Sequence, residues 1–168
     1  CKSVWFMRQA GRYLPEFKEI RSKNKNFINL CLDSDLSSEI TLQPIKRYNL
    51  DSAIIFSDIL LVPYALGQEV DFIKDKGPVL SKFKLIRFLK NNKDNFKKTL
   101  DPVYKAIEKT RQRLDKEKSL ISFIGAPWTL LIYMMGWKED IKEINFLEIK
   151  NKETEISVII NELNEYLC

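Results

Sequence analysis

The sequence contains no histidine, and it has only five glycines and three cysteines among its 168 residues. Any imidazole acid, base or metal ligand must therefore come from outside this chain. The cysteines, Cys1, Cys31 and Cys168, form an odd and widely spaced set without a CxxC pair. This argues against a disulfide framework or a zinc site and is typical of a reducing compartment, so we expect no metal.

Long hydrophobic runs are also lacking. The longest apolar stretches, Ala53–Phe56 and Ile59–Leu66, fall well short of the ~20 residues that a membrane-spanning helix needs. No segment resembles a signal or transit peptide, although the first residue is not Met and a leader is left open. We therefore expect no membrane partner and a cytoplasmic location, with a plastid-type organelle as the alternative.

The net charge of +5 comes mainly from lysine, most densely between Lys82 and Lys98, where Lys is mixed with Asn and Phe. Nucleic-acid binding would require aromatic platforms or an Arg-rich recognition element beside the charge. Because this stretch has neither, we interpret it as a solvated helical surface and expect no nucleic-acid partner.

Strand-like segments alternate with helix-like ones. Residues 53–56 and 120–124 are short apolar runs of the kind that form buried parallel strands, and residues 70–73 and 78–80 predict a small hairpin. This alternation predicts an α/β fold with a parallel sheet. A (β/α)8 barrel takes roughly 200 or more residues, so a chain with two such strands is too short to close one.

Helices are predicted at about residues 33–47, 101–117 and 152–167 from capping residues and apolar spacing. Pro44 is expected to kink the first of these or to end it early. The opening segment, with Pro15 near its centre, is expected to be a loop with short helical turns.

Three arginines, Arg8, Arg12 and Arg21, lie near the start among apolar residues. Guanidinium groups in such surroundings need anionic partners, and their planar forks suit carboxylates. Ala10 and Gly11 between them leave the backbone open to a ligand. From the residues alone, surface salt bridges and an anion-binding site both remain open.

Asp58 comes directly after the first predicted strand. Catalytic groups of parallel α/β folds gather at the carboxyl ends of strands, although a turn cap is the alternative. Tyr133 lies on a predicted helix after the second strand, where an amphipathic core tyrosine is the simpler interpretation.

Four blocks of this sequence resemble, in order, blocks of the uroporphyrinogen decarboxylase family. They are Trp5–Glu16, Thr41–Pro44, Ala53–Leu60 and Gly125–Thr129 with Tyr133. The first block is long enough to be highly specific, and its position makes the active-site interpretation of the arginines and Asp58 the favoured one.

The resemblance implies an incomplete (β/α)8 TIM barrel, with residues 1–168 as the N-terminal part of a single barrel domain whose C-terminal half is absent. It implies a carboxy-lyase that removes the four acetate carboxyl groups of uroporphyrinogen III, giving coproporphyrinogen III in haem biosynthesis. The family needs no metal or organic cofactor and is usually a homodimer. The fragment alone is expected to be inactive, because the family also uses a serine and a histidine from its second half.

Carried over residue by residue, the family's substrate-contacting positions correspond to Arg8, Ala10, Arg12, Arg21, Asp58 and Tyr133. Of these, Asp58, Arg8 and Tyr133 are expected to be catalytic. Arg8 is the family's candidate proton donor, but an arginine pKa above about 12 favours a role in orienting carboxylates. The alternative functions are a corrinoid-dependent methyltransferase of the same barrel superfamily and a non-catalytic tetrapyrrole-binding fragment.

Overall fold

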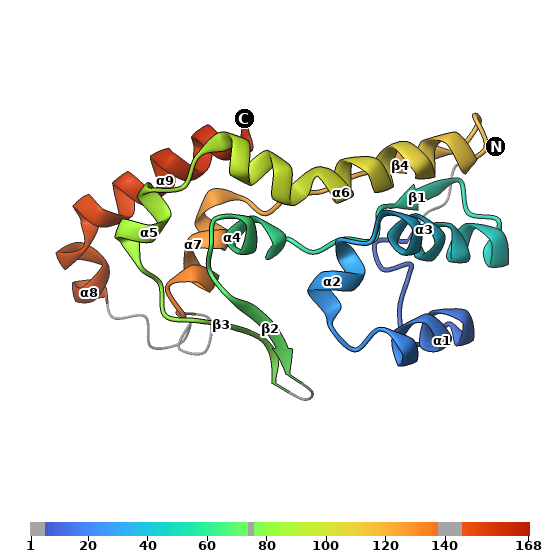
Figure 1. Ribbon diagram of the computed structural model, residues 1–168, viewed down its shortest axis with the longest axis horizontal. Coiled ribbons are helices and arrows are strands. Elements are labelled where there is room, and N and C mark those ends of the chain that lie inside the picture. Colours follow the sequence, from blue (N-terminus) through green and yellow to red (C-terminus); the bar gives the residue numbers. More distant parts are fainter. Residues whose placement is uncertain (1–5, 74–75, 138–145) are drawn as a thin grey trace. The chain divides into compact units, whose positions relative to one another are not determined.

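The computed structural model describes residues 6–73, 76–137 and 146–168 and divides into two compact units (Figure 1). The first unit contains Cys1–Asp58 and Leu100–Phe123, and the second contains Ile59–Thr99 and Ile124–Cys168. Each unit has its own apolar core, made of the residues described below.

The first unit is built on two parallel strands, β1 (Ser52–Ile54) and β4 (Ser119–Ile121). Ala53 lies opposite Leu120, and the pairing continues beyond both strands through backbone hydrogen bonds from Ser119 to Asp51 and from Ile55 to Ile121. The two predicted strands are thus confirmed, although both are shorter and begin one residue earlier. Helical segments lie between them in the chain, as the α/β prediction requires.

Three helices precede β1: α1 (Pro15–Lys23), α2 (Phe27–Cys31) and α3 (Ser34–Tyr48). The expected loop with short turns is wrong for α1, because Pro15 occupies the first turn, where its missing N–H has no helical acceptor to lose. The helix predicted at about residues 33–47 is confirmed as α3, in which the carboxylate of Asp33 caps two backbone N–H groups. The helix nevertheless continues past Pro44, whose whole side chain is buried with the surrounding apolar face.

Helix α6 (Lys93–Arg113) begins eight residues before the predicted start at Asp101. The side chain of Asn92 accepts a hydrogen bond from the N–H of Asn95 at 2.8 Å, which makes Asn92 the effective cap. Pro102 therefore lies inside the helix and does not begin it.

Two apolar clusters form the core of the first unit. One joins the C-terminal half of α3 to both strands and to the end of α6: Leu42, Ile45, Leu50, Ala53, Leu114 and Leu120. The other joins α1, α2 and the start of α3 to the end of β1: Ala10, Leu14, Phe17, Ile20, Leu30, Leu36, Ile40 and Phe56. The second cluster thus fixes the residues just before Asp58.

The second unit contains α4 (Leu61–Ala65), the hairpin β2 (Val70–Ile73) and β3 (Gly77–Leu80), and α5 (Leu85–Leu89). The predicted hairpin is confirmed, with Val70 opposite Leu80, and the two strands lie side by side in Figure 1. The lysines between Lys82 and Lys98 are exposed on the segments that flank α5 and on the first turns of α6, as the interpretation of a solvated surface requires.

Helices α7 (Pro127–Met134), α8 (Phe146–Asn151) and α9 (Glu153–Leu167) complete the second unit. The helix predicted at 152–167 is confirmed, and its apolar face packs on α7 through the buried side chains of Ile156, Ile159 and Leu163. Within the three described ranges, no helix is long and apolar enough to cross a membrane.

Candidate functional site

The chain just after β1 is held by hydrogen bonds to α3. The hydroxyl of Thr41 accepts the backbone N–H of Phe56 at 2.8 Å and donates to the carbonyl of Ser37 at 2.7 Å. The hydroxyl of Ser37 in turn donates to the carbonyl of Phe56 at 2.6 Å. Both backbone groups of Phe56 are therefore fixed two residues before Asp58.

The ring of Phe56 is held as firmly as its backbone. It meets Phe17 and Phe27 edge-on, with centroid distances of 5.7 Å in each pair. Such edge-to-face contacts are favourable beyond the area they bury. Because the backbone and the ring of Phe56 are both fixed, the half-buried Asp58 follows a rigid stretch of chain.

The charged groups of Asp58 and Arg21 both lie near the buried thiol of Cys31. Burial raises the pKa of this thiol above its ordinary value, the negative charge of Asp58 raises the pKa further, and the positive charge of Arg21 lowers it. Since such effects weaken with distance, both charged groups lie close to the sulfur. The structure thus brings together two of the six predicted site residues.

Arg21 is half-buried in the last turn of α1. Its guanidinium donates to the backbone carbonyl of Asn24 and stacks over the ring of Phe27, 5.9 Å from the centroid. These contacts restrain the side chain, which limits the entropy lost when a planar guanidinium binds a carboxylate.

The segment that carries Arg8, Ala10 and Arg12 is anchored to β1 by Gln9. The buried amide of Gln9 donates to the carbonyl of Ser52 at 2.8 Å and accepts the N–H of Ile54 at 3.1 Å. Arg8 and Arg12 are exposed on either side of this anchor, and Ala10 is half-buried against the cluster around Phe17. The two arginines therefore project from a segment whose backbone is fixed.

Tyr133 is half-buried on α7 and belongs to the second unit, whereas the other five predicted site residues belong to the first. Its expected role as a catalytic, substrate-contacting residue accordingly stays a prediction. No group of three His, Cys, Asp or Glu in the parts of the chain that the structure describes is arranged to hold a metal ion.

Three residues that position the site were not predicted as site residues: Gln9, Ser37 and Thr41. All three are buried polar side chains, which fold stably only when hydrogen-bonded. Ser37 and Thr41 stand four residues apart among the apolar residues of α3, and this spacing was the available signal. Gln9 carried no signal of its own, because its partners lie more than forty positions away.

Comparison with known proteins decides the family. The sequence profile of uroporphyrinogen decarboxylase matches residues 2–167, which is nearly the whole chain. This chain belongs to the uroporphyrinogen decarboxylase family. The predicted family is thereby confirmed, and the predicted fold class with it: the parallel β1–β4 pair and its helices are part of the family's (β/α)8 barrel.

Named relatives agree with this assignment. Uroporphyrinogen decarboxylase of Rickettsia felis is 49% identical over 154 residues, which cover 89% of this chain and 44% of the relative. That of Rickettsia africae is 51% identical over 135 residues, covering 80% of this chain and 39% of the relative. The chain thus spans less than half the length of these members of the family.

A solved structure of a methyltransferase from Methanosarcina mazei resembles this chain with a TM-score of 0.55, covering 88% of this chain and 48% of the methyltransferase. At 17% sequence identity, this likeness concerns the fold alone.

Proposed function

We propose that this chain is the N-terminal part of a uroporphyrinogen decarboxylase, a carboxy-lyase that converts uroporphyrinogen III into coproporphyrinogen III. The observation that carries the proposal is the family match across residues 2–167. Residues 1–168 are then one part of a single barrel domain, and the rest of the barrel supplies the remaining strands together with the family's serine and histidine.

The substrate explains the arginines. Uroporphyrinogen carries eight carboxylates around a flexible macrocycle, so a cleft for it needs several cations at its rim. Arg8 and Arg12 are exposed on the segment that Gln9 fixes, and Arg21 is held over Phe27. We assign these three side chains to binding and orienting carboxylates, with the backbone at Ala10 offering a close approach between them.

Asp58 is the proposed centre of the chemistry. The four pyrrole N–H groups of the macrocycle can converge on one acceptor, and an ionised carboxylate accepts several hydrogen bonds at once. The position of Asp58 after a strand whose last residues are held by Ser37 and Thr41 supports this role. A preorganised negative charge is most effective when it is fixed before the reaction begins.

The reaction needs an electron sink, and the substrate provides its own. A proton added to the pyrrole α-carbon next to the ring carbon that bears the acetate group turns the pyrrole into a cation that is conjugated with that ring carbon. The bond to the carboxylate carbon then breaks, CO₂ leaves, and the electron pair of that bond neutralises the ring. A second proton, taken up at the exocyclic carbon, converts it into a methyl group, and loss of the first proton restores the pyrrole.

During these reaction steps the negative charge of Asp58 lowers the energy of the cationic ring, an effect often worth several kcal/mol. Arg8 orients the reacting carboxylate and is the family's candidate for the proton transfer. Tyr133 is proposed to be a further catalytic residue that contacts the substrate, as the resemblance to the family implies. The substrate thus takes the part that an organic cofactor has in other decarboxylases.

We further propose that the complete protein is a homodimer, that it works without a metal or organic cofactor, and that it acts in the cytoplasm. Bacterial relatives support the cytoplasmic assignment, with a plastid-type organelle as the alternative. The fold likeness to a methyltransferase does not favour corrinoid chemistry, because it concerns the fold alone.

The test is Asp58→Asn in the complete protein, with Asp71→Asn on the exposed face of β2 as the matched control. Asn keeps the shape and one acceptor but loses the charge, so kcat for coproporphyrinogen formation should fall by several orders of magnitude. The control should retain its activity. A loss within about tenfold, equivalent to ~1.4 kcal/mol, would show that Asp58 is not the charge-stabilising group.

A further inference from the structure

Gly125 lies between β4 and α7, where it is buried and has no room for a side chain. A Cβ atom at this position would lie 2.7 Å from Cδ2 and 3.0 Å from Cγ of Leu130, and 3.2 Å from Cβ of Ile59. Carbon atoms that are not bonded to one another pack at about 3.5–4.0 Å. The φ angle of Gly125 is not in the left-handed region that favours glycine. Space, and not backbone conformation, therefore requires a glycine here.

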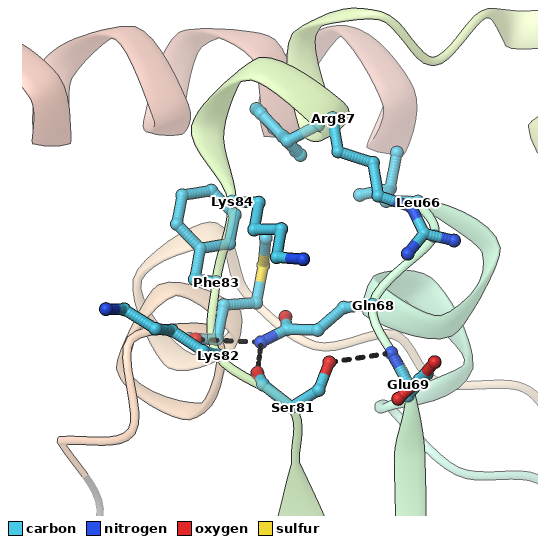
Figure 2. A pocket seen from close by; sticks show the side chains of 11 residues that line it. Leu66, Gln68, Glu69, Ser81, Lys82, Phe83, Lys84 and Arg87 are labelled. Carbon is cyan, nitrogen blue, oxygen red and sulfur yellow. Dashed lines mark hydrogen bonds between the residues drawn. The ribbon is translucent and has the colours of Figure 1, made fainter.

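The helix on one side of this contact is held in place. Leu130 is fully buried on α7, and α7 packs against α9 in the same unit. The far end of α7 is tied by Gln68, whose amide nitrogen donates to the backbone carbonyls of Met134 at 2.9 Å and Ser81 at 2.7 Å (Figure 2). Because α7 is restrained along its side and at its end, it has little freedom to move away from a larger residue at position 125.

The other side of the contact is the chain that follows Asp58. Ile59 meets the glycine through its Cβ, the atom bonded directly to the backbone, so crowding there is relieved only by a shift of the main chain. Ile59 is half-buried and is joined to Asp58 by one peptide bond. Tyr133 lies on α7 one turn after Leu130. The contact at Gly125 thus adjoins two proposed catalytic residues, one through the chain and one through the helix.

We propose that Gly125 is a positioning residue for the decarboxylation, a role that rests on the proposed function. Its missing side chain lets the segment after Asp58 lie against the start of α7, the helix that carries Tyr133. Gly125 contributes no chemistry of its own and acts only through these two residues. A methyl group at this position would push Ile59 by a few tenths of an ångström. Since a misplacement of about 1 Å can cost roughly a hundredfold in rate, a smaller shift is measurable in kcat.

The test is Gly125→Ala in the complete protein, with coproporphyrinogen formation measured per folded enzyme well below the unfolding temperature. We expect kcat to fall by about tenfold or more, because the reacting groups are displaced. The KM for uroporphyrinogen III should stay within about threefold, because the arginines assigned to carboxylate binding belong to the first unit. Unchanged kcat in the folded variant would overturn the proposal.

Leu130→Ala is the matched control. It removes the two nearest atoms of the contact and adds no bulk, so it should lower stability, as loss of buried methyl groups does, without pushing Ile59. Its kcat should stay within about threefold of that of the unaltered protein. An equal fall of kcat in Leu130→Ala and Gly125→Ala would mean that Gly125 only fills space in the core, and this would overturn the proposal.

The double variant Gly125→Ala/Leu130→Ala makes room for the added methyl group, so its kcat should recover to that of Leu130→Ala alone. A double variant as slow as Gly125→Ala would overturn the proposal. If Gly125→Ala by itself does not fold, the Leu130→Ala background carries the test. There Gly125→Ala should keep kcat, whereas Gly125→Val, with two more methyl groups, should lose it; equal rates would contradict the role.

Failure of the proposed function gives a different result from failure of this role. An unaltered complete protein that forms no coproporphyrinogen would contradict the proposed function, and the positioning role would fall with it. An active protein whose kcat does not respond to crowding at Gly125 would contradict the positioning role alone.

Discussion

The hydroxyl of Thr41, on α3, accepts the backbone N–H of Phe56 at 2.8 Å, beyond the end of β1. This bond ties a buried helix to the residue that precedes Ser57 and Asp58. Thr110 provides a close comparison, because it is equally buried and also donates to the carbonyl four residues earlier.

Thr41→Val should therefore destabilise the chain by about 1–3 kcal/mol, because it leaves the Phe56 N–H without an acceptor. Thr110→Val removes the same donor bond from a helix carbonyl but no accepted bond, so its cost should be clearly smaller. Urea unfolding of both variants measures the difference. Equal losses would mean that the Phe56 bond contributes nothing specific.

Arg12→Lys in the complete protein should weaken binding of the octacarboxylate substrate and make binding more sensitive to salt. The charge survives, but the planar fork that grips a carboxylate through two bonds is lost. Arg111→Lys is the control, since Arg111 binds three backbone carbonyls near the end of α6. If Arg12→Lys binds as tightly as the unaltered protein at low and moderate ionic strength, Arg12 is not a carboxylate clamp.

Cys31 should resist alkylation at pH 8 while Cys168 reacts. Cys31 is fully buried, and burial together with the charge of Asp58 raises its thiol pKa, so the reactive thiolate is scarce; Cys168 is exposed. Peptide mapping by mass spectrometry after treatment with iodoacetamide measures both sites, and unfolding in urea should make Cys31 react. Rapid labelling of Cys31 in the folded chain would contradict the burial described here.

The same thiol gives a pH dependence at the alkaline end. A raised pKa in the folded state means that the unfolded chain loses the Cys31 proton first as the pH rises. Stability from this group is therefore complete below the ordinary thiol value of 9.0 and declines above it. In Cys31→Ala the decline above pH 9 should be smaller, as measured by urea unfolding between pH 7 and 10.

The ion pair between Glu16 and Arg47 gives the opposite dependence. Arg47 donates two hydrogen bonds of 2.9 Å to the Glu16 carboxylate and holds the pKa of that carboxyl below its ordinary value of 4.5. The pair therefore stabilises the fold above pH 4.5 and loses this effect as the pH falls through the lowered value. The stability gap between the unaltered chain and Glu16→Gln should shrink in acid; a gap independent of pH would contradict the pairing.

The sequence predicted the elements whose signals are local. The helix at about residues 33–47, the hairpin of residues 70–73 and 78–80 and the helix at 152–167 were predicted from signals that act within a few residues, and all three are observed. The start of α6 was predicted wrongly because two cap signals compete, and Asn92 prevails over Asp101.

The candidate site was predictable only through its resemblance to a family. Neighbourhoods such as Asp58 and Arg21 around Cys31 depend on how α1, α2 and β1 pack, and no local pattern encodes that packing. The same is true of Gln9, which pairs with residues 43 and 45 positions away. Hydrogen bonds over such separations follow from the fold rather than from the spacing of residues.

Both edges of strand β1 are hydrogen-bonded, one to strand β4 and the other to side chains. Asp51 and Ile55 bond to β4, while the groups that face the other way, on Ser52, Ile54 and Phe56, bond to side chains. An open strand edge invites pairing with another chain, and this edge is shielded against it. The same side chains that fix the approach to Asp58 therefore also keep this edge of β1 from pairing with the edge of another chain.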